Sequence, residues 1–196
     1  MRFKQLVYFT FLVVFLSSSF VQALSVKSLT LKQMVALSTR IANVTVTDTR
    51  IEEDENGHIV QYITCDVNEW LEGDGGPTLV YKQIANVSES ADINLVSKNG
   101  TQVPVPQKGH TYLLFLGDDS EKTGLVAPIG LYQGQIELKN VNGEVTAPGL
   151  SANKSLVKSV QAKGLSKPLS DGERALLGGS EKYNDLKAAI QAAMAE

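Results

Sequence analysis

Apolar and polar residues alternate along several short stretches of the chain, and this two-residue period limits the possible folds more than any other feature. It is clearest between residues 41 and 47, where one side of the stretch carries Ala42, Val44 and Val46. Because successive side chains of a strand point to opposite faces of a sheet, the pattern predicts a strand with one buried face. Asn56-Gly57 tolerates the positive φ angles of a tight turn, so we expect residues 58–71 to return as an antiparallel strand.

Further strands are expected up to residue 148. Residues 78–84 predict a third strand, and the nearly continuous apolar run 111–116 predicts a central strand that is buried on both faces. Residues 124–127 and 135–138 are shorter candidates, and Asn142-Gly143 marks another reversal of the chain. Residues 85–110 lack a sustained period, and a loop of this length inside a domain is often functional.

Helical periodicity is confined to the two ends of the mature chain. Residues 28–38 predict a short amphipathic helix, and Ser170 and Glu173 have capping-box spacing before a helix that Gly178-Gly179 ends. Ser180 is expected to cap a final helix over residues 181–194. The apolar stripe of that helix consists of Tyr183, Leu186, Ile190 and Met194. Such a stripe predicts packing on the sheet, with a partner-binding or membrane-lying helix as the alternatives.

The first 23 residues have the three parts of a secretory signal. Arg2 and Lys4 precede an apolar stretch from Leu6 to Leu16, and the segment closes with Val21-Gln22-Ala23. Small residues at the first and third positions before a cleavage point favour cutting between Ala23 and Leu24. The alternative is a membrane anchor, but the apolar stretch is shorter than the roughly 20 residues that cross a bilayer. We therefore expect a secreted or periplasmic protein without stable membrane insertion after cleavage.

Length and charge narrow the possibilities further. The 196 residues suit one ordinary domain, and 18 basic against 21 acidic side chains give a net charge of −3. Removal of the signal leaves 16 basic against 21 acidic side chains, or −5. An acidic chain without a long basic run argues against a nucleic-acid partner. The expected organisation is a signal peptide at 1–23, a β-barrel domain with its N-terminal helix at 24–148, a polar connector at 149–169 and a packed helical segment at 170–196.

The order of these segments resembles that of a widespread group of uncharacterised bacterial secreted proteins. The resemblance covers most of residues 28–138 and the final helix. It is carried by the helix that begins Ser28-Leu29-Thr30-Leu31, the strand at 38–46, the strand ending at Leu71-Glu72-Gly73, and the segments KGHTYLLFL at 108–116 and GLYQGQI at 130–136. The same order is similar to the netrin-like module of tissue inhibitors of metalloproteinases. This similarity implies a mainly β fold, a five-stranded antiparallel barrel like the oligonucleotide/oligosaccharide-binding (OB) fold, flanked by a short N-terminal helix and a C-terminal amphipathic helix.

The similarity to the inhibitors does not extend to their functional residues. In those proteins a cysteine at the mature N-terminus chelates the zinc of the target, and disulfides hold that terminus. This chain would begin Leu24-Ser25-Val26, and its single cysteine is Cys65. No inhibitory residue is therefore transferred. Cys65 shares a face with Ile63 and Val67, which indicates a buried thiol with a packing role.

Catalytic and metal-binding motifs are sparse. His58 and His110 are the two histidines, and no Gly-x-Ser-x-Gly elbow accompanies them. Two separated histidines and one cysteine do not supply the ligands that zinc needs. The acidic loops at 52–55 and 118–121 offer oxygen ligands for calcium, but they lack EF-hand spacing, and we interpret them as solvated turns. We predict no metal site and no cofactor.

Two functions of different class remain. The first is a non-catalytic binding module for an unknown protein or glycan, with Tyr81, Tyr112 and Tyr132 as possible stacking residues beside the 85–110 excursion. The alternative for these tyrosines is a place in the core. The second function is a hydrolase with a carboxylate-based site, for example Asp66 and Glu69. A purely structural envelope role is a third possibility. We favour the non-enzymatic binding module.

Overall fold

The computed structural model describes residues 28–85, 95–96, 102–103, 105–130, 132–150, 156 and 169–196. The predicted signal peptide lies outside the described residues, as do most of the 85–110 excursion and most of the 149–169 connector. No helix within the described ranges combines the length and the apolar character that a bilayer crossing requires.

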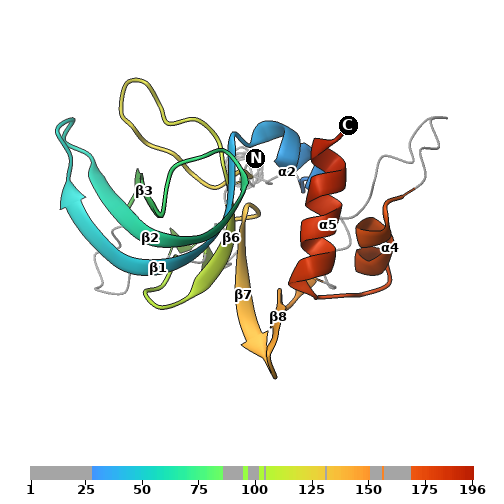
Figure 1. Ribbon diagram of the computed structural model, residues 1–196. Helices are drawn as coiled ribbons and strands as arrows, with labels where there is room; N and C mark the ends of the chain where they lie inside the picture. The colour runs from blue at the N-terminus through green and yellow to red at the C-terminus, as the bar shows by residue number, and fades with distance from the viewer. Residues whose placement is uncertain are drawn as a thin grey trace, which may run out of the picture.

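Six strands form one antiparallel sheet in the order β3-β2-β1-β6-β7-β8 (Figure 1). The strands are β1 (Arg40–Glu53), β2 (Ile59–Glu72), β3 (Thr78–Ile84), β6 (Thr111–Leu116), β7 (Gln135–Val141) and β8 (Glu144–Thr146). A separate two-stranded ladder pairs β4 (Leu95–Val96) with β5 (Gln102–Val103). Strands β1 and β2 bend together into a curved arm, and β7 and β8 project as a hairpin beside the helices (Figure 1).

Strand β1 is longer than the sequence indicates. It continues through the first acidic residues to Glu53 because residues 48–53 stay paired with β2. The turn that follows is stabilised by Asp54, whose Oδ1 accepts the backbone N–H groups of Asn56 at 2.9 Å and His58 at 3.0 Å. Gly57 adopts a φ of 76°, which is the role expected for the Asn-Gly pair.

Strand β6 is buried on both faces, as its apolar run predicts. Tyr112, Leu114 and Leu116 point into the concave side of the curved sheet. There they join a cluster, here called the inner core, with apolar residues of β1, β2 and β3. Leu113 and Phe115 point the other way into a second cluster, here called the helix-side core, beneath the three helices. The fold therefore has two apolar cores on opposite faces of β6.

In the described part of the chain, three short helices cover the second face. They are α2 (Leu31–Leu37), α4 (Asp171–Leu177) and α5 (Tyr183–Met194). Helix α2 begins with a capping box between Thr30 and Gln33, and α4 begins with the predicted one between Ser170 and Glu173. Helix α5 packs through Tyr183, Leu186, Ala189 and Ile190. The helix begins two residues later than predicted, because Lys182 rather than Ser180 occupies the N-cap position.

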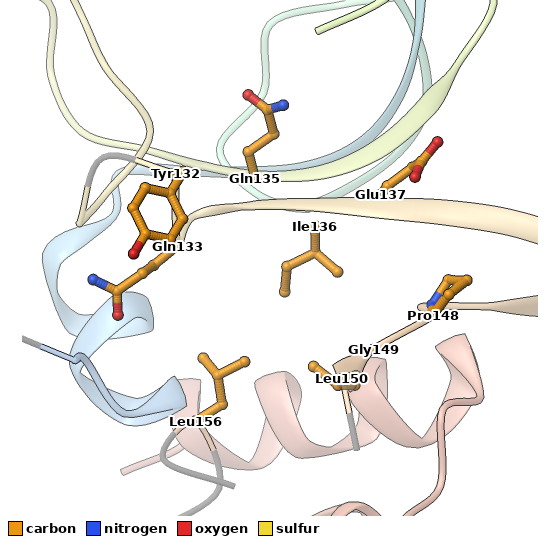
Figure 2. Close-up of a pocket in the computed structure, with 9 residues that line it drawn as sticks. All are labelled: Tyr132, Gln133, Gln135, Ile136, Glu137, Pro148, Gly149, Leu150 and Leu156. Atoms are coloured by element: carbon orange, nitrogen blue, oxygen red, sulfur yellow. The ribbon is translucent and has the colours of Figure 1, made fainter. Parts of the chain in front are cut away.

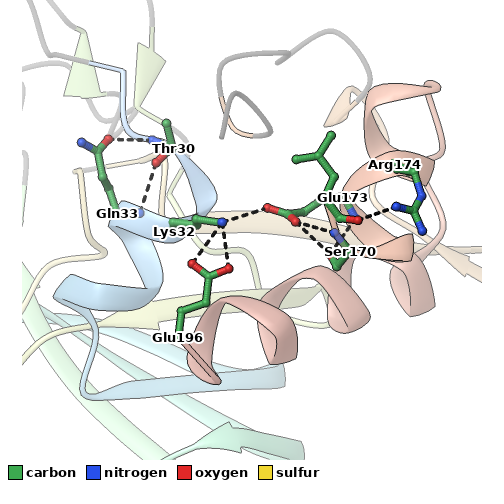
Figure 3. Close-up of polar contacts among 8 residues, drawn as sticks. Thr30, Lys32, Gln33, Ser170, Glu173, Arg174 and Glu196 are labelled. Atoms are coloured by element: carbon green, nitrogen blue, oxygen red, sulfur yellow. Dashed lines mark hydrogen bonds and ion pairs between the residues drawn. The ribbon is translucent and has the colours of Figure 1, made fainter. Parts of the chain in front are cut away.

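Lys32 connects the three helices (Figure 3). Its Nζ lies 3.0 Å and 3.1 Å from the two carboxylate oxygens of Glu196, just beyond α5. The same Nζ lies 3.6 Å from Oε1 of Glu173, the buried carboxylate that closes the α4 capping box. The hydrogen bond to Glu196, followed by the charge of Glu173, raises the pKa of Lys32 although burial opposes this. The two ends of the described chain are thus joined on one face of the sheet.

The closed five-stranded barrel expected from the sequence is not confirmed. The sheet has six strands, and its edge strands β3 and β8 do not pair with each other in the described part of the chain. The predicted strand at 124–127 is present only as an isolated parallel bridge between Leu125 and Lys82, and Pro128, just beyond it, forms an antiparallel bridge with Leu116. The sixth strand, β8, was missed because three residues carry too little periodicity to be recognised.

Candidate functional site

A hollow of about 180 Å³ lies between β7 and the chain around residue 150 (Figure 2). Its floor is apolar and consists of Ile136, Pro148, Leu150 and Leu156. Ile136 projects from β7 toward Leu150 and Leu156, whereas Gln135 and Glu137 point to the other side of the strand. Tyr132 and Gln133 form one end of the hollow. An apolar floor with a few polar groups at its edge is the usual composition of a binding pocket.

The turn before β7 positions Tyr132. Gln133 fixes this turn, because its Oε1 accepts the backbone N–H of Leu29 at 2.8 Å and its Nε2 donates to the Gly130 carbonyl at 3.2 Å. Gly134 packs so tightly that a Cβ there would lie 2.7 Å from the Ile129 nitrogen. Tyr132 itself stays 37% exposed. The turn is therefore held in place while the aromatic ring of Tyr132 remains accessible.

The three tyrosines proposed from the sequence do not form one site. Tyr81 and Tyr112 are 3% and 5% exposed and lie in the inner core, which is the alternative that we considered for them. Neither ring can stack on a ligand without opening that core. Tyr132 lies at the hollow and is the accessible member of the three. The 85–110 excursion, which was expected to border the site, is described only at residues 85, 95–96, 102–103 and 105–110.

Glu137 links the edge of the hollow to the start of β6. Its Oε1 lies 2.8 Å from Nδ1 of His110, and its Oε2 lies 3.3 Å from Nζ of Lys139. Burial would raise the pKa of Glu137, but the hydrogen bonds from His110 and Lys139 outweigh it and lower the pKa. The His110 ring also stacks on Tyr112, with 6.3 Å between ring centroids. His110 is therefore held by a carboxylate partner and an aromatic neighbour.

The two carboxylates of the hydrolase hypothesis have different surroundings. Asp66 is exposed on β2. Glu69 accepts a hydrogen bond from the Tyr183 hydroxyl at 3.0 Å and forms an ion pair with Lys187, so it ties β2 to α5. Neither residue is among the described residues that line the hollow, where Glu137 is the one carboxylate. A hydrolytic pair at Asp66 and Glu69 gains no geometric support from this arrangement.

The acidic loop at 52–55 is not the fully solvated turn that the sequence predicts, because Asp54 is buried. The Asp54 side chain is fully buried and its Oδ2 accepts a hydrogen bond from Nζ of Lys82 at 3.2 Å. Burial would raise the pKa of Asp54, but the hydrogen bonds from His58, Lys82 and Asn56 lower it to about 2. In the second loop Asp119 pairs with Arg40. Within the described ranges no three histidine, cysteine or acidic side chains come together in a way that could hold a metal ion.

Cys65 is fully buried in the inner core beside Ile63. Burial, assisted by the charge of Asp66, raises the pKa of its thiol to about 12. A thiol in these surroundings stays protonated at neutral pH and is a poor nucleophile.

Comparisons with known proteins identify no relative. No family model matches the chain, and no curated protein or solved structure matches it.

Proposed function

We propose that the mature chain is an exported, non-catalytic binding module whose contact site is the hollow beside Tyr132. The observation that carries this proposal is the contrast among the three tyrosines, because Tyr132 remains 37% exposed at the end of an apolar hollow whereas Tyr81 and Tyr112 are buried. Export is supported by the signal pattern of residues 1–23 and a cleavage site after Ala23. The module then acts in the periplasm or outside the cell.

We further propose that the curved sheet belongs to the OB-like class and that the chain is related to the bacterial secreted group that it resembles. The bridges of Leu125 to β3 and of Pro128 to β6 support this, because they connect the open edge of β3 to β6 across the concave side. The backbone hydrogen bond from the Val126 N–H to the Lys82 carbonyl, at 2.9 Å, strengthens that connection. The β7–β8 hairpin and the helices are then additions to the small barrel.

The ligand is an apolar side chain of a partner protein or one sugar ring of a glycan. Either would place an apolar face on Ile136, Leu150 and Leu156 and would use the Tyr132 ring as a stacking surface. The fixed turn around Gln133 favours binding, because little conformational entropy is lost when a rigid site is filled.

The experiment uses residues 24–196 on a glycan array and in pull-downs from envelope extracts, followed by titration of each captured ligand. Tyr132→Ala is expected to weaken binding about tenfold, since a stacked aromatic ring contributes roughly 0.5–1.5 kcal/mol beyond its buried area. Ile51→Ala is the control, because Ile51 is equally exposed, at 37%, but lies on the β1 arm. Equal binding by the Tyr132 variant and the unmodified chain would remove the hollow from the proposal.

A further inference from the structure

The Tyr81 hydroxyl is a buried polar group without a partner. Tyr81 is directly opposite Ile63 in the β2–β3 ladder, so its side chain enters the inner core, where it is 3% exposed. Its Oη forms no hydrogen bond with any described protein atom. Leaving a hydroxyl unpaired in an apolar core is unfavourable, and such groups in folded proteins are usually bonded to protein or to an ordered water.

Two other polar groups face the same interior. The Cys65 thiol on β2 and the Tyr112 hydroxyl on β6 both belong to the inner core with Tyr81. Cys65 lies two residues along β2 from Ile63, the residue opposite Tyr81, so the thiol and the Tyr81 side chain share one face of the β2–β3 ladder. Burial raises the pKa of Tyr81, and interactions with Cys65 and Tyr112 raise it further. The Tyr112 Oη accepts the backbone N–H of Gln107 at 3.1 Å. Among the described residues it has no acceptor for its own proton.

We propose that Tyr81, Tyr112 and Cys65 form an internal binding site for a single water molecule. The water accepts the proton of the Tyr81 hydroxyl and that of the Tyr112 hydroxyl, and it donates a hydrogen bond to the Cys65 sulfur. A buried water that makes about three hydrogen bonds is the usual solution for polar groups enclosed by apolar side chains. It would join β3, β2 and β6 across the concave side of the sheet, at a place where the ladder hydrogen bonds do not reach.

The experiment combines a crystal structure of the purified protein with urea unfolding of Tyr81→Phe. We expect density for one water about 3 Å or less from Tyr81 Oη. We also expect Tyr81→Phe to raise the unfolding equilibrium constant about three- to tenfold, because the variant loses a satisfied hydrogen bond. Tyr132→Phe is the matched control and should leave this constant unchanged, since Tyr132 is exposed.

Two outcomes would overturn the proposal. One is a structure whose density shows no water beside Tyr81 Oη. The other is an unfolding constant for Tyr81→Phe that equals or falls below that of the unmodified protein, because removing a hydroxyl that is truly unpaired stabilises the folded state. The sign of the change therefore distinguishes a hydrated hydroxyl from an unpaired one, even though the substitution removes a single atom.

Discussion

Gly172 lies at a close approach between helices α4 and α5. A Cβ built at Gly172 would lie 2.5 Å from the backbone nitrogen of Ala189 and 2.6 Å from the carbonyl oxygen of Asp185. Ordinary contact begins at 3.4 Å, so α4 would have to move away by about 0.9 Å. The atoms that it meets belong to the backbone of another helix and cannot rotate away. Gly172→Ala must therefore separate the helices or distort one of them.

The magnitude follows from two opposing effects. Overpacking of this kind costs about 1–3 kcal/mol. Alanine recovers up to about 1 kcal/mol relative to glycine inside a helix, and less near an end such as this one. We expect a net loss of about 1–2 kcal/mol, which for a domain of this size lowers Tm by roughly 2–8 °C.

Calorimetry and hydrogen exchange measure this effect. The Tm of Gly172→Ala should fall, and the amides of α4 should exchange faster because the helix is displaced from α5. Gly117→Ala is the control, since its nearest neighbour would lie at 3.5 Å and its backbone needs no positive φ. An unchanged Tm together with unchanged exchange in α4 would refute the close approach of the two helices.

Three further predictions concern the hairpin and the two cores. The pKa of Asp54 is depressed, so the stability that this carboxylate provides is complete above its ordinary pKa of 3.8 and is lost as the pH falls toward about 2. In urea unfolding, Asp54→Asn should lack this pH dependence. A pH profile identical to that of the unmodified protein would contradict the buried pair with Lys82. The Cys65 thiol should react with a disulfide reagent at pH 8 only after unfolding in denaturant, and rapid labelling of the folded protein would contradict its burial. Leu113→Ala and Leu114→Ala should each lower the free energy of unfolding by about 2–5 kcal/mol, although the two residues lie in different cores. If chemical denaturation showed a loss below about 1 kcal/mol for either variant, β6 would not be buried on both faces.

The parts of the fold that follow from local pattern were predictable from the sequence. Residues 78–84 and 111–116 were predicted with the bounds that β3 and β6 have, because each has a clear apolar pattern between turn residues. The capping box at Ser170 and Glu173 was predictable for the same reason, since both of its hydrogen bonds join residues three positions apart. Features that depend only on neighbouring residues can be identified without knowledge of the tertiary structure.

The parts that depend on distant contacts were not predictable. The bridges at Leu125 and Pro128 join segments that only the tertiary fold brings together. The buried state of Asp54 depends on Lys82, which lies 28 residues away on another strand. An acidic run such as 52–55 reads as a solvated turn because its composition does not show which of its members faces a lysine.

The tyrosines illustrate how strand parity could have improved the site prediction. Tyr112 lies on the same face of β6 as Leu114 and Leu116. A strand that is buried on both faces cannot present an accessible ring. Tyr81 shares the face of Leu79, which points into the same core. Tyr132 lies outside any strand, in the turn before β7, so no alternation assigns it to a core. The position outside a strand therefore distinguishes Tyr132 from the other two tyrosines, but the hollow beside it requires Leu150 and Leu156 to approach β7, which only the fold shows.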